Sequence, residues 1–145
     1  MSNVNSLQEI HILANSIRRT YNRLRHTTDQ IHDGLEMSAP KRTLLMDIDR
    51  EGPQTVPMLA SLRYVSRQII QTQVNELLEL GYLVSKDNPA HKRSYLIALT
   101  ATGRSLVKRM QKAEIEYLQQ LGWLPEADKL VTCLNVLDTI YEKLE

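Results

Sequence analysis

Apolar residues recur every three or four positions at the start of this chain, a spacing that fits one face of an α-helix and no other regular structure. The stripe consists of Leu7, Ile10, Ala14, Ile17, Tyr21, Leu24, Thr28 and Ile31. It predicts one helix over residues 6–32, ~40 Å long at 1.5 Å per residue and stopped at Gly34. A helix of that length exceeds what a small domain's core needs. The stripe therefore packs along its own subunit or meets a second chain.

The end of the chain repeats the pattern on a wider face, which spans an arc of about 160° on a helical wheel. A terminal helix that apolar needs cover on more than one side, and a second copy of so short a chain is the simplest source. Pro125 is predicted as the first residue of this helix. We expect the dimer contacts at Leu7, Ile10, Ala14, Ile17, Leu130, Leu134, Leu137, Tyr141 and Leu144.

Composition excludes several classes of protein. Apolar residues make up 42% of the 145 residues and charged residues 24%, as in ordinary globular domains. No apolar run approaches the ~18 residues of a membrane span, and the first six residues lack the features of a signal peptide. We therefore expect a single cytoplasmic subunit with no membrane contact. No phosphate-binding glycine loop, nucleophile elbow or zinc-protease motif is present, so neither an enzyme nor a cofactor is expected.

Net charge gives no argument for a nucleic-acid partner. The chain carries 18 Lys and Arg against 17 Asp and Glu, whereas a nucleic-acid binder often has a clear basic excess. Any such function must rest on where individual charges lie.

The middle of the chain changes to short elements. A helix is expected from about residue 38 to Gly52, a short strand at Thr55-Val56, and a two-turn helix over residues 57–62. Ser66 is a natural N-cap for a further helix that runs to Leu80 and is closed by Gly81. The two helices match a helix-turn-helix, although the turn at residues 63–65 lacks the glycine often found there.

A hairpin and a third long helix follow. Strands are predicted at residues 82–84 and 95–99, on either side of a polar loop. A helix is predicted over residues 101–121, with Thr100 as its N-cap and Gly122 as its stop. A helix-turn-helix followed by a β-hairpin is a winged helix.

Two short motifs make the pattern specific. Leu-x-x-x-Gly-Tyr-Leu ends at Leu83, and Leu-Thr-x-x-Gly covers residues 99–103, after His91-Lys92-Arg93. Together they resemble the multiple antibiotic resistance regulator (MarR) family over nearly the whole chain. The resemblance implies one subunit over residues 1–145, mainly α with a small β-hairpin wing (α+β). Residues 38–100 would form a winged-helix DNA-binding lobe, and residues 6–33 and 101–145 a helical dimerisation lobe.

The resemblance also implies a function. Members of the family are homodimeric transcription regulators that bind pseudo-palindromic double-stranded DNA. By this resemblance we expect a repressor that a small-molecule effector releases from its operator. The sequence names neither the effector nor the operator, and activation stays open. The alternative is a winged helix that serves only as a protein-interaction module and does not bind DNA. The polar recognition face argues mildly against it, since protein interfaces favour aromatic anchors.

The helix that begins after Ser66 is expected to read bases with its first turns. Glutamine can bond adenine bidentately, and isoleucine or threonine can contact a thymine methyl group. The expected base-reading residues are Gln68, Ile69, Gln71, Thr72 and Gln73. Phosphate or wing contacts are expected from Arg63, Ser66, Arg67, Lys86, His91, Lys92 and Arg93. A merely solvated helix face is the alternative.

The wing departs from the family pattern at His91. The family often has aspartate two residues before the wing arginine, which commonly enters the minor groove and corresponds to Arg93. A carboxylate can hold that arginine and a neutral imidazole cannot, so we expect Arg93 to be less fixed. Because imidazole gains a proton in the physiological pH range, His91 could add pH-dependent affinity for phosphate. An exposed histidine with no role is the alternative.

Two further groups are not expected to bind or sense anything. His26, Asp29 and Asp33 share one side of the first helix, but no cysteine or second histidine-rich segment joins them, which favours a solvated face over a metal site. Cys133, the one cysteine, lies in the apolar arc of the last helix and is expected to be a buried, inert thiol.

Overall fold

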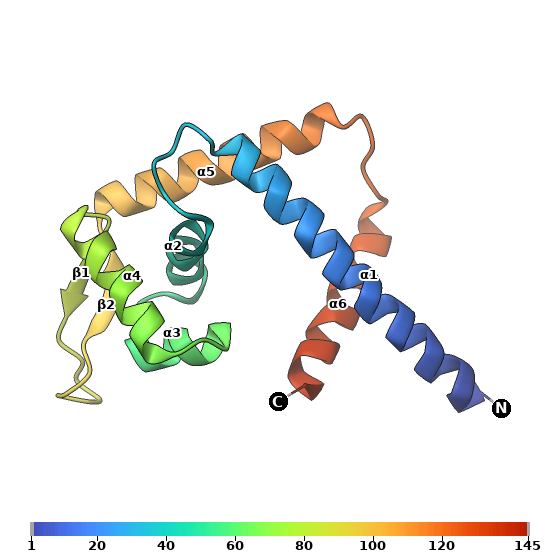
Figure 1. Cartoon of the computed structure of the whole chain (residues 1–145), viewed down its shortest axis with the longest axis horizontal. Coiled ribbons are helices and arrows are strands. Elements are labelled where there is room, and N and C mark those ends of the chain that lie inside the picture. Colours follow the sequence, from blue (N-terminus) through green and yellow to red (C-terminus); the bar gives the residue numbers. More distant parts are fainter. Residues whose placement is uncertain (1, 145) are drawn as a thin grey trace. The chain divides into compact units, whose positions relative to one another are not determined.

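The computed structural model describes residues 2–144, and side chains from Asn5 to Leu144 (Figure 1). Its elements are α1 (Ser2–Ile31), α2 (Ala39–Glu51), α3 (Val56–Arg63), α4 (Arg67–Glu79), β1 (Leu83–Lys86), β2 (Leu96–Leu99), α5 (Ala101–Gln120) and α6 (Ala127–Lys143). The chain forms two compact units, residues 1–114 and 115–145. The predicted fold class, mainly helical with one β-hairpin, is confirmed. No described helix is both long and apolar enough to cross a bilayer.

The core of the first unit lies among α2, α3, α4, the hairpin and the beginning of α5. Its fully buried side chains are Leu44, Leu45, Leu59, Ile70, Val74, Leu77, Leu106, Val107 and Met110. On α4 the buried residues fall on one face, as predicted, which leaves the opposite face to solvent. Two ion pairs hold the helix-turn-helix to α2, between Asp47 and Arg63 of α3 and between Lys41 and Glu76 of α4.

Hydroxyl side chains cap the helices where the sequence predicted. The Ser66 hydroxyl accepts a 3.2 Å hydrogen bond from the Ile69 amide, and the Thr100 hydroxyl accepts a 3.0 Å bond from the Gly103 amide. Each satisfies a backbone donor that the first turn leaves free. Gly52 and Gly122 end α2 and α5 with φ values of +79° and +67°, so the predicted stops are confirmed.

The strand predicted at Thr55-Val56 is wrong. The Thr55 hydroxyl accepts a 3.3 Å hydrogen bond from the Met58 amide, so Thr55 caps α3 and Val56 is already helical. The extended pairing lies one residue earlier, where Gln54 and Ile97 exchange both backbone hydrogen bonds. A β-branched pair is compatible with a strand or a helix start, and the proline at position 57 suits the first turn of a helix.

The hairpin begins one residue later than predicted. Leu83 pairs with Leu99 and Lys86 with Leu96. Tyr82 is not in the strand, because its amide donates to the Leu77 carbonyl and closes α4. The tyrosine is thus part of the helix end rather than of the sheet.

The last helix starts later than predicted and buries nothing in the described chain. Glu126 is its N-cap and Ala127 its first residue, so the placement of Pro125 as first residue is wrong by two positions. The acidic Asp128 lies in the first turn, where it complements the helix dipole. Cys133 is exposed, so its predicted burial is wrong for this chain by itself. Its helix has no buried residue from Ala127 to Lys143.

Candidate nucleic-acid interface

The outer face of α4 carries the five residues predicted to read bases. Four of them are exposed and Gln73 is half-buried. The Gln71 side-chain amide donates to Asn75 Oδ1 at 2.9 Å, and the Thr72 hydroxyl donates to the Gln68 carbonyl at 3.0 Å. Both side chains are therefore held along the helix surface. Ile69 is 49% exposed, which leaves an apolar group on a polar face.

A groove of about 390 Å³ separates α4 from the wing. It is lined by Val56, Pro57, Arg67, Gln68, Gln71, Leu78, Ser85, Arg93, Ser94, Tyr95 and Ile97. The fold thus brings Arg67 of α4 and Arg93 of the wing, far apart in sequence, to the walls of one groove. Among the described residues no carboxylate pairs with either guanidinium. The groove is therefore an uncompensated cationic surface on a chain whose net charge is only +1.

The start of α4 adds further groups that suit an anion. Ser66 and Arg67 are both exposed there. The first amides of a helix point outward along its axis and carry partial positive charge. Backbone amides, a hydroxyl and a guanidinium at one place form a surface that suits a phosphate group.

Arg63 forms an ion pair within the fold and does not line the groove. Its Nε donates to Asp47 Oδ2, and the Asp47 side chain is 8% exposed against 24% for Arg63. The guanidinium therefore neutralises a buried carboxylate of α2. Its predicted contact with phosphate stays a prediction, since a guanidinium has further donors beyond Nε.

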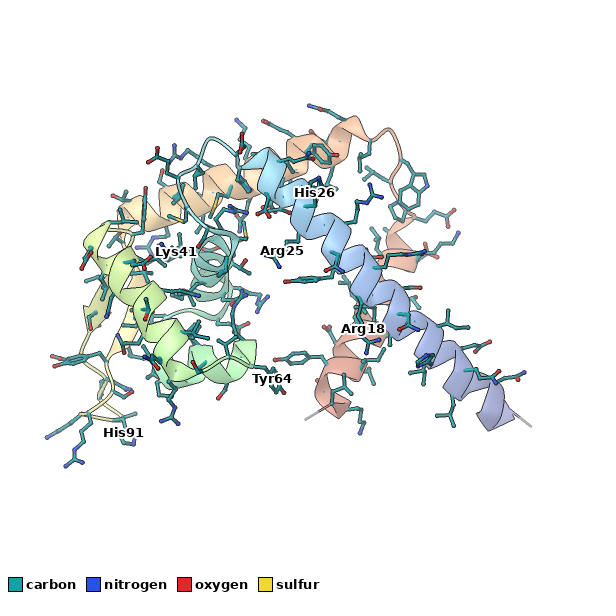
Figure 2. All side chains as sticks on the ribbon, in the orientation of Figure 1. Arg18, Arg25, His26, Lys41, Tyr64 and His91 are labelled. Atoms are coloured by element: carbon teal, nitrogen blue, oxygen red, sulfur yellow. The ribbon has the colours of Figure 1, made fainter. Side chains whose placement is uncertain are left out.

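The wing tip is shaped by backbone turns rather than by a carboxylate. The Asn88 side-chain oxygen accepts from the Ala90 amide, and the Asn88 carbonyl accepts from the His91 amide, both at 3.1 Å. The His91 carbonyl in turn accepts from the Ser94 amide at 3.1 Å. His91 lies at the tip of the hairpin (Figure 2). The other predicted wing residues, Lys86, Lys92 and Arg93, are exposed as well.

A second polar cluster anchors the end of α1. Arg42 of α2 bonds the Asp29 carboxylate and, at 2.8 Å, the Met37 carbonyl. His32 Nε2 lies 2.9 Å from Glu114 Oε1 of α5, and the histidine is buried. Asp29 is exposed, as expected for a solvated face, and it also supplies the counter-charge that the buried Arg42 needs. Among the described residues no group of three or more candidate ligands could hold a metal ion.

The residues predicted to form the dimer are open to solvent in the single chain. Leu7 is 68% exposed, Leu134 58% and Leu144 76%. Ile10, Leu130 and Tyr141 are also exposed, whereas Ala14, Ile17 and Leu137 are partly covered. Exposed large apolar side chains in such numbers on each of these two helices indicate that each helix is an interaction site.

Two exposed aromatic residues close to α4 and its groove were not identified from the sequence. Tyr64, in the turn before α4, is 71% exposed, and Tyr95, which lines the groove, is 59% exposed. The absent turn glycine was the available signal for Tyr64. No sequence signal identified Tyr95.

Comparison with known proteins agrees with this geometry. A family model described as "MarR family" matches residues 36–94. A MarR family transcriptional regulator from Silicibacter pomeroyi DSS is similar at 23% identity, with 90% of this chain and 88% of that chain covered and a TM-score of 0.81. Wild-type MarR (apo form) from E. coli is similar at 19% identity, with 88% and 95% covered and a TM-score of 0.73.

BpsR from Bordetella bronchiseptica is similar at 19% identity, with 88% of this chain and 91% of that chain covered and a TM-score of 0.68. No curated protein sequence matches the chain. At these identities the structural likeness establishes the fold, and the family model covers the helix-turn-helix and the wing. Residues 36–94, which hold the winged helix, therefore match the MarR family model, and the chain as a whole has the fold seen in solved MarR transcriptional regulators.

Proposed function

We propose that this protein is a homodimeric, sequence-specific DNA-binding transcription regulator of the cytoplasm. The observation that carries the proposal is the groove between α4 and the wing. Arg67 and Arg93 line it without a carboxylate partner in the described chain, beside the exposed amides of Gln68 and Gln71. A cationic groove lined with adenine-reading side chains suits a duplex.

Binding would divide the work between two elements. The first turns of α4 enter the major groove, where Gln68, Gln71 and Thr72 face base edges. Arg93 on the wing reaches the adjacent minor groove, whose negative potential is strongest where A·T pairs narrow it. Ser66, Arg67 and the first amides of α4 hold phosphate and set the register.

A dimer supplies the second reading helix. The exposed apolar residues of α1 and α6 need cover, and a second copy of the chain offers the same residues in return. Two copies of α4 about 34 Å apart would enter successive major grooves of one pseudo-palindromic operator. Each copy contributes its own cationic groove, which makes a near-neutral chain sufficient for binding.

Release by a small molecule follows from the same geometry. A ligand that favours another spacing of the two α4 helices lowers operator affinity by its differential affinity for the two states. The Bordetella relative is described as regulated in its DNA binding by 6-hydroxynicotinic acid, which supports an effector of this kind here. We propose repression that such an effector relieves.

The test is capture of DNA by the purified full chain. Fragments upstream of its own gene and of neighbouring genes are scored by electrophoretic mobility shift in low salt, and metabolite pools are then added to bound complexes. One fragment retained with a symmetric footprint supports the proposal. Indifference to every fragment, and to nonspecific duplex at low salt, contradicts it and favours the protein-interaction module.

A further inference from the structure

The two helices of the helix-turn-helix end in the same backbone motif. After α4, the Gly81 amide donates to Leu78 and the Tyr82 amide to Leu77, each at 3.0 Å. After α3, the Tyr64 amide donates to Ser61 and the Val65 amide to Ala60, each at 3.2 Å. This paired pattern satisfies the last carbonyls of a helix and places the residue after it in the left-handed region.

The residue in that position differs between the two ends. Gly81 has a φ of +75°, which glycine adopts freely, whereas Tyr64 has a φ of +52°. Tyr64 is the one non-glycine residue with positive φ in the described chain. A side chain in this region clashes with its own backbone, so a tyrosine destabilises the turn relative to a glycine.

The backbone hydrogen bonds of the motif would form equally well with glycine, and the tyrosine side chain itself does not offset the strain. Tyr64 is 71% exposed, so its ring gains little from packing. Its hydroxyl has no hydrogen-bond partner among the described residues. Residues with strained backbone conformations cluster at functional sites.

The place of Tyr64 suggests which function it has. It lies at the end of α3, in the connection to α4 (Figure 2), two residues before the cap Ser66 and three before Arg67. If the first turns of α4 enter the major groove, the residues just before them lie at the groove's edge, beside the sugar-phosphate backbone. Tyrosine hydroxyls are among the donors that bind phosphate oxygens in protein–DNA complexes.

We propose that Tyr64 is a DNA-contact residue that donates its phenolic hydroxyl to a phosphate at the edge of the major groove. The strained turn holds that hydroxyl outward before DNA arrives. The inference rests on the proposed function, because it requires α4 to meet a duplex. The proposed contact joins a neutral phenol to the DNA backbone, so it should add affinity without adding sequence specificity.

The test uses two substitutions with opposite effects on the fold. Tyr64→Gly removes both strain and hydroxyl, so its melting temperature should rise by ~3 °C while operator affinity falls about tenfold. Tyr64→Phe keeps the strain and removes the hydroxyl, so affinity should fall to a similar degree with the melting temperature unchanged. Tyr21→Phe changes a tyrosine of α1 that is 61% exposed; it is the control and should bind as the wild type does.

Two further readouts identify a phosphate contact. Tyr64→Phe should weaken binding to the operator and to unrelated duplex by the same factor, and the slope of affinity against salt should not change, because a neutral phenol displaces no counterion. Wild-type affinity in Tyr64→Phe, when the wild type binds its operator, overturns this inference alone. A wild type that binds no duplex overturns the proposed function as well.

Discussion

The side-chain hydroxyl of Thr100 donates a 2.6 Å hydrogen bond to the carbonyl oxygen of Gly81. The Thr100 hydroxyl oxygen also accepts from the Gly103 amide and so caps α5, and the Thr100 amide donates to the Tyr82 carbonyl at 3.0 Å. One threonine thus joins the end of α4, the base of the wing and the start of α5. The two motifs that make the sequence resemble MarR regulators therefore meet in space and fix the base of the wing to the end of α4.

Gly103→Ala should severely destabilise the protein. A Cβ at Gly103 would lie 2.1 Å from the Tyr82 carbonyl oxygen, which is backbone and cannot turn aside. We expect a loss of at least ~3 kcal/mol in the free energy of unfolding, measured by urea denaturation. Gly34→Ala is the control, since nothing lies within 4 Å of a Cβ there. Equal stability of the two variants would contradict the close approach.

Asp47 and Arg63 should show strong energetic coupling. The Asp47 carboxylate is nearly buried, and removal of Arg63 leaves it without its main counter-charge. A double-mutant cycle of Asp47→Ala and Arg63→Ala should give a coupling of ~2 kcal/mol, above the value of an exposed ion pair. The exposed pair of Glu126 and Lys129 provides the comparison. Coupling as weak as in that pair would show that Arg63 is not committed to the fold.

Arg67→Ala and Arg93→Ala should each reduce the salt dependence of operator binding. If each guanidinium neutralises one phosphate in each half-site, its loss lowers the slope of log affinity against log salt by about 1 per contact. The measurement is fluorescence anisotropy of a labelled operator across a salt series. Lys108→Ala, an exposed lysine of α5, should leave the slope unchanged. An unchanged slope in both arginine variants would exclude the groove as the DNA surface.

Leu134→Glu should abolish the dimer. Leu134 is 58% exposed in the single chain and lies midway along α6, within its apolar arc, so a dimer would bury a charge there without a partner. Sedimentation velocity should show a monomer at micromolar concentration and operator binding should be lost. Asn135→Glu, on the opposite side of the same helix, should stay dimeric. A dimeric Leu134→Glu would place the interface elsewhere.

His91→Ala should remove a pH dependence from operator binding. Imidazole is the side chain whose charge is most often pH-dependent near neutrality, and His91 is an exposed wing residue close in sequence to Lys92, Arg93 and Asp87. When the pH is lowered from 8 to 5.5, wild-type affinity should rise by about fivefold more than that of His91→Ala, which corresponds to ~1 kcal/mol of charge interaction in water. His26→Ala, an exposed histidine of α1, is the control. Identical pH profiles for wild type and His91→Ala would show that His91 has no such role.

The helix ends were predictable where one residue decides them locally. Ser66 and Thr100 cap helices because the hydroxyl of each reaches the amide three residues ahead. Thr55 shows the limit of this reasoning, because a threonine before a valine suits a strand as well as a cap. The extended pairing falls on Gln54, which pairs with Ile97 forty-three residues away, and Thr55 is left to cap α3. A pairing at that sequence distance cannot be predicted from a local pattern.

The charged pairs were beyond prediction for a similar reason. Arg63 was expected at phosphate, yet its partner Asp47 lies on a different helix, and Arg42 likewise reaches Asp29 of α1. A sequence shows that an arginine is present but not which carboxylate the folded core leaves nearby. The exposed face of α4 was predicted well, since the spacing of Ile70, Val74 and Leu77 alone determines it.

The final helix has a consequence for how the proposed dimer responds to its own concentration. A segment that buries nothing in its own chain draws its packing energy from association, so in the proposed dimer the ordering of α6 is a bimolecular step. Dilution would then lower the stability of the folded dimer, and its melting temperature would increase with protein concentration. The number of copies in a cell would therefore determine the fraction of chains that are dimeric and able to bind both half-sites of an operator.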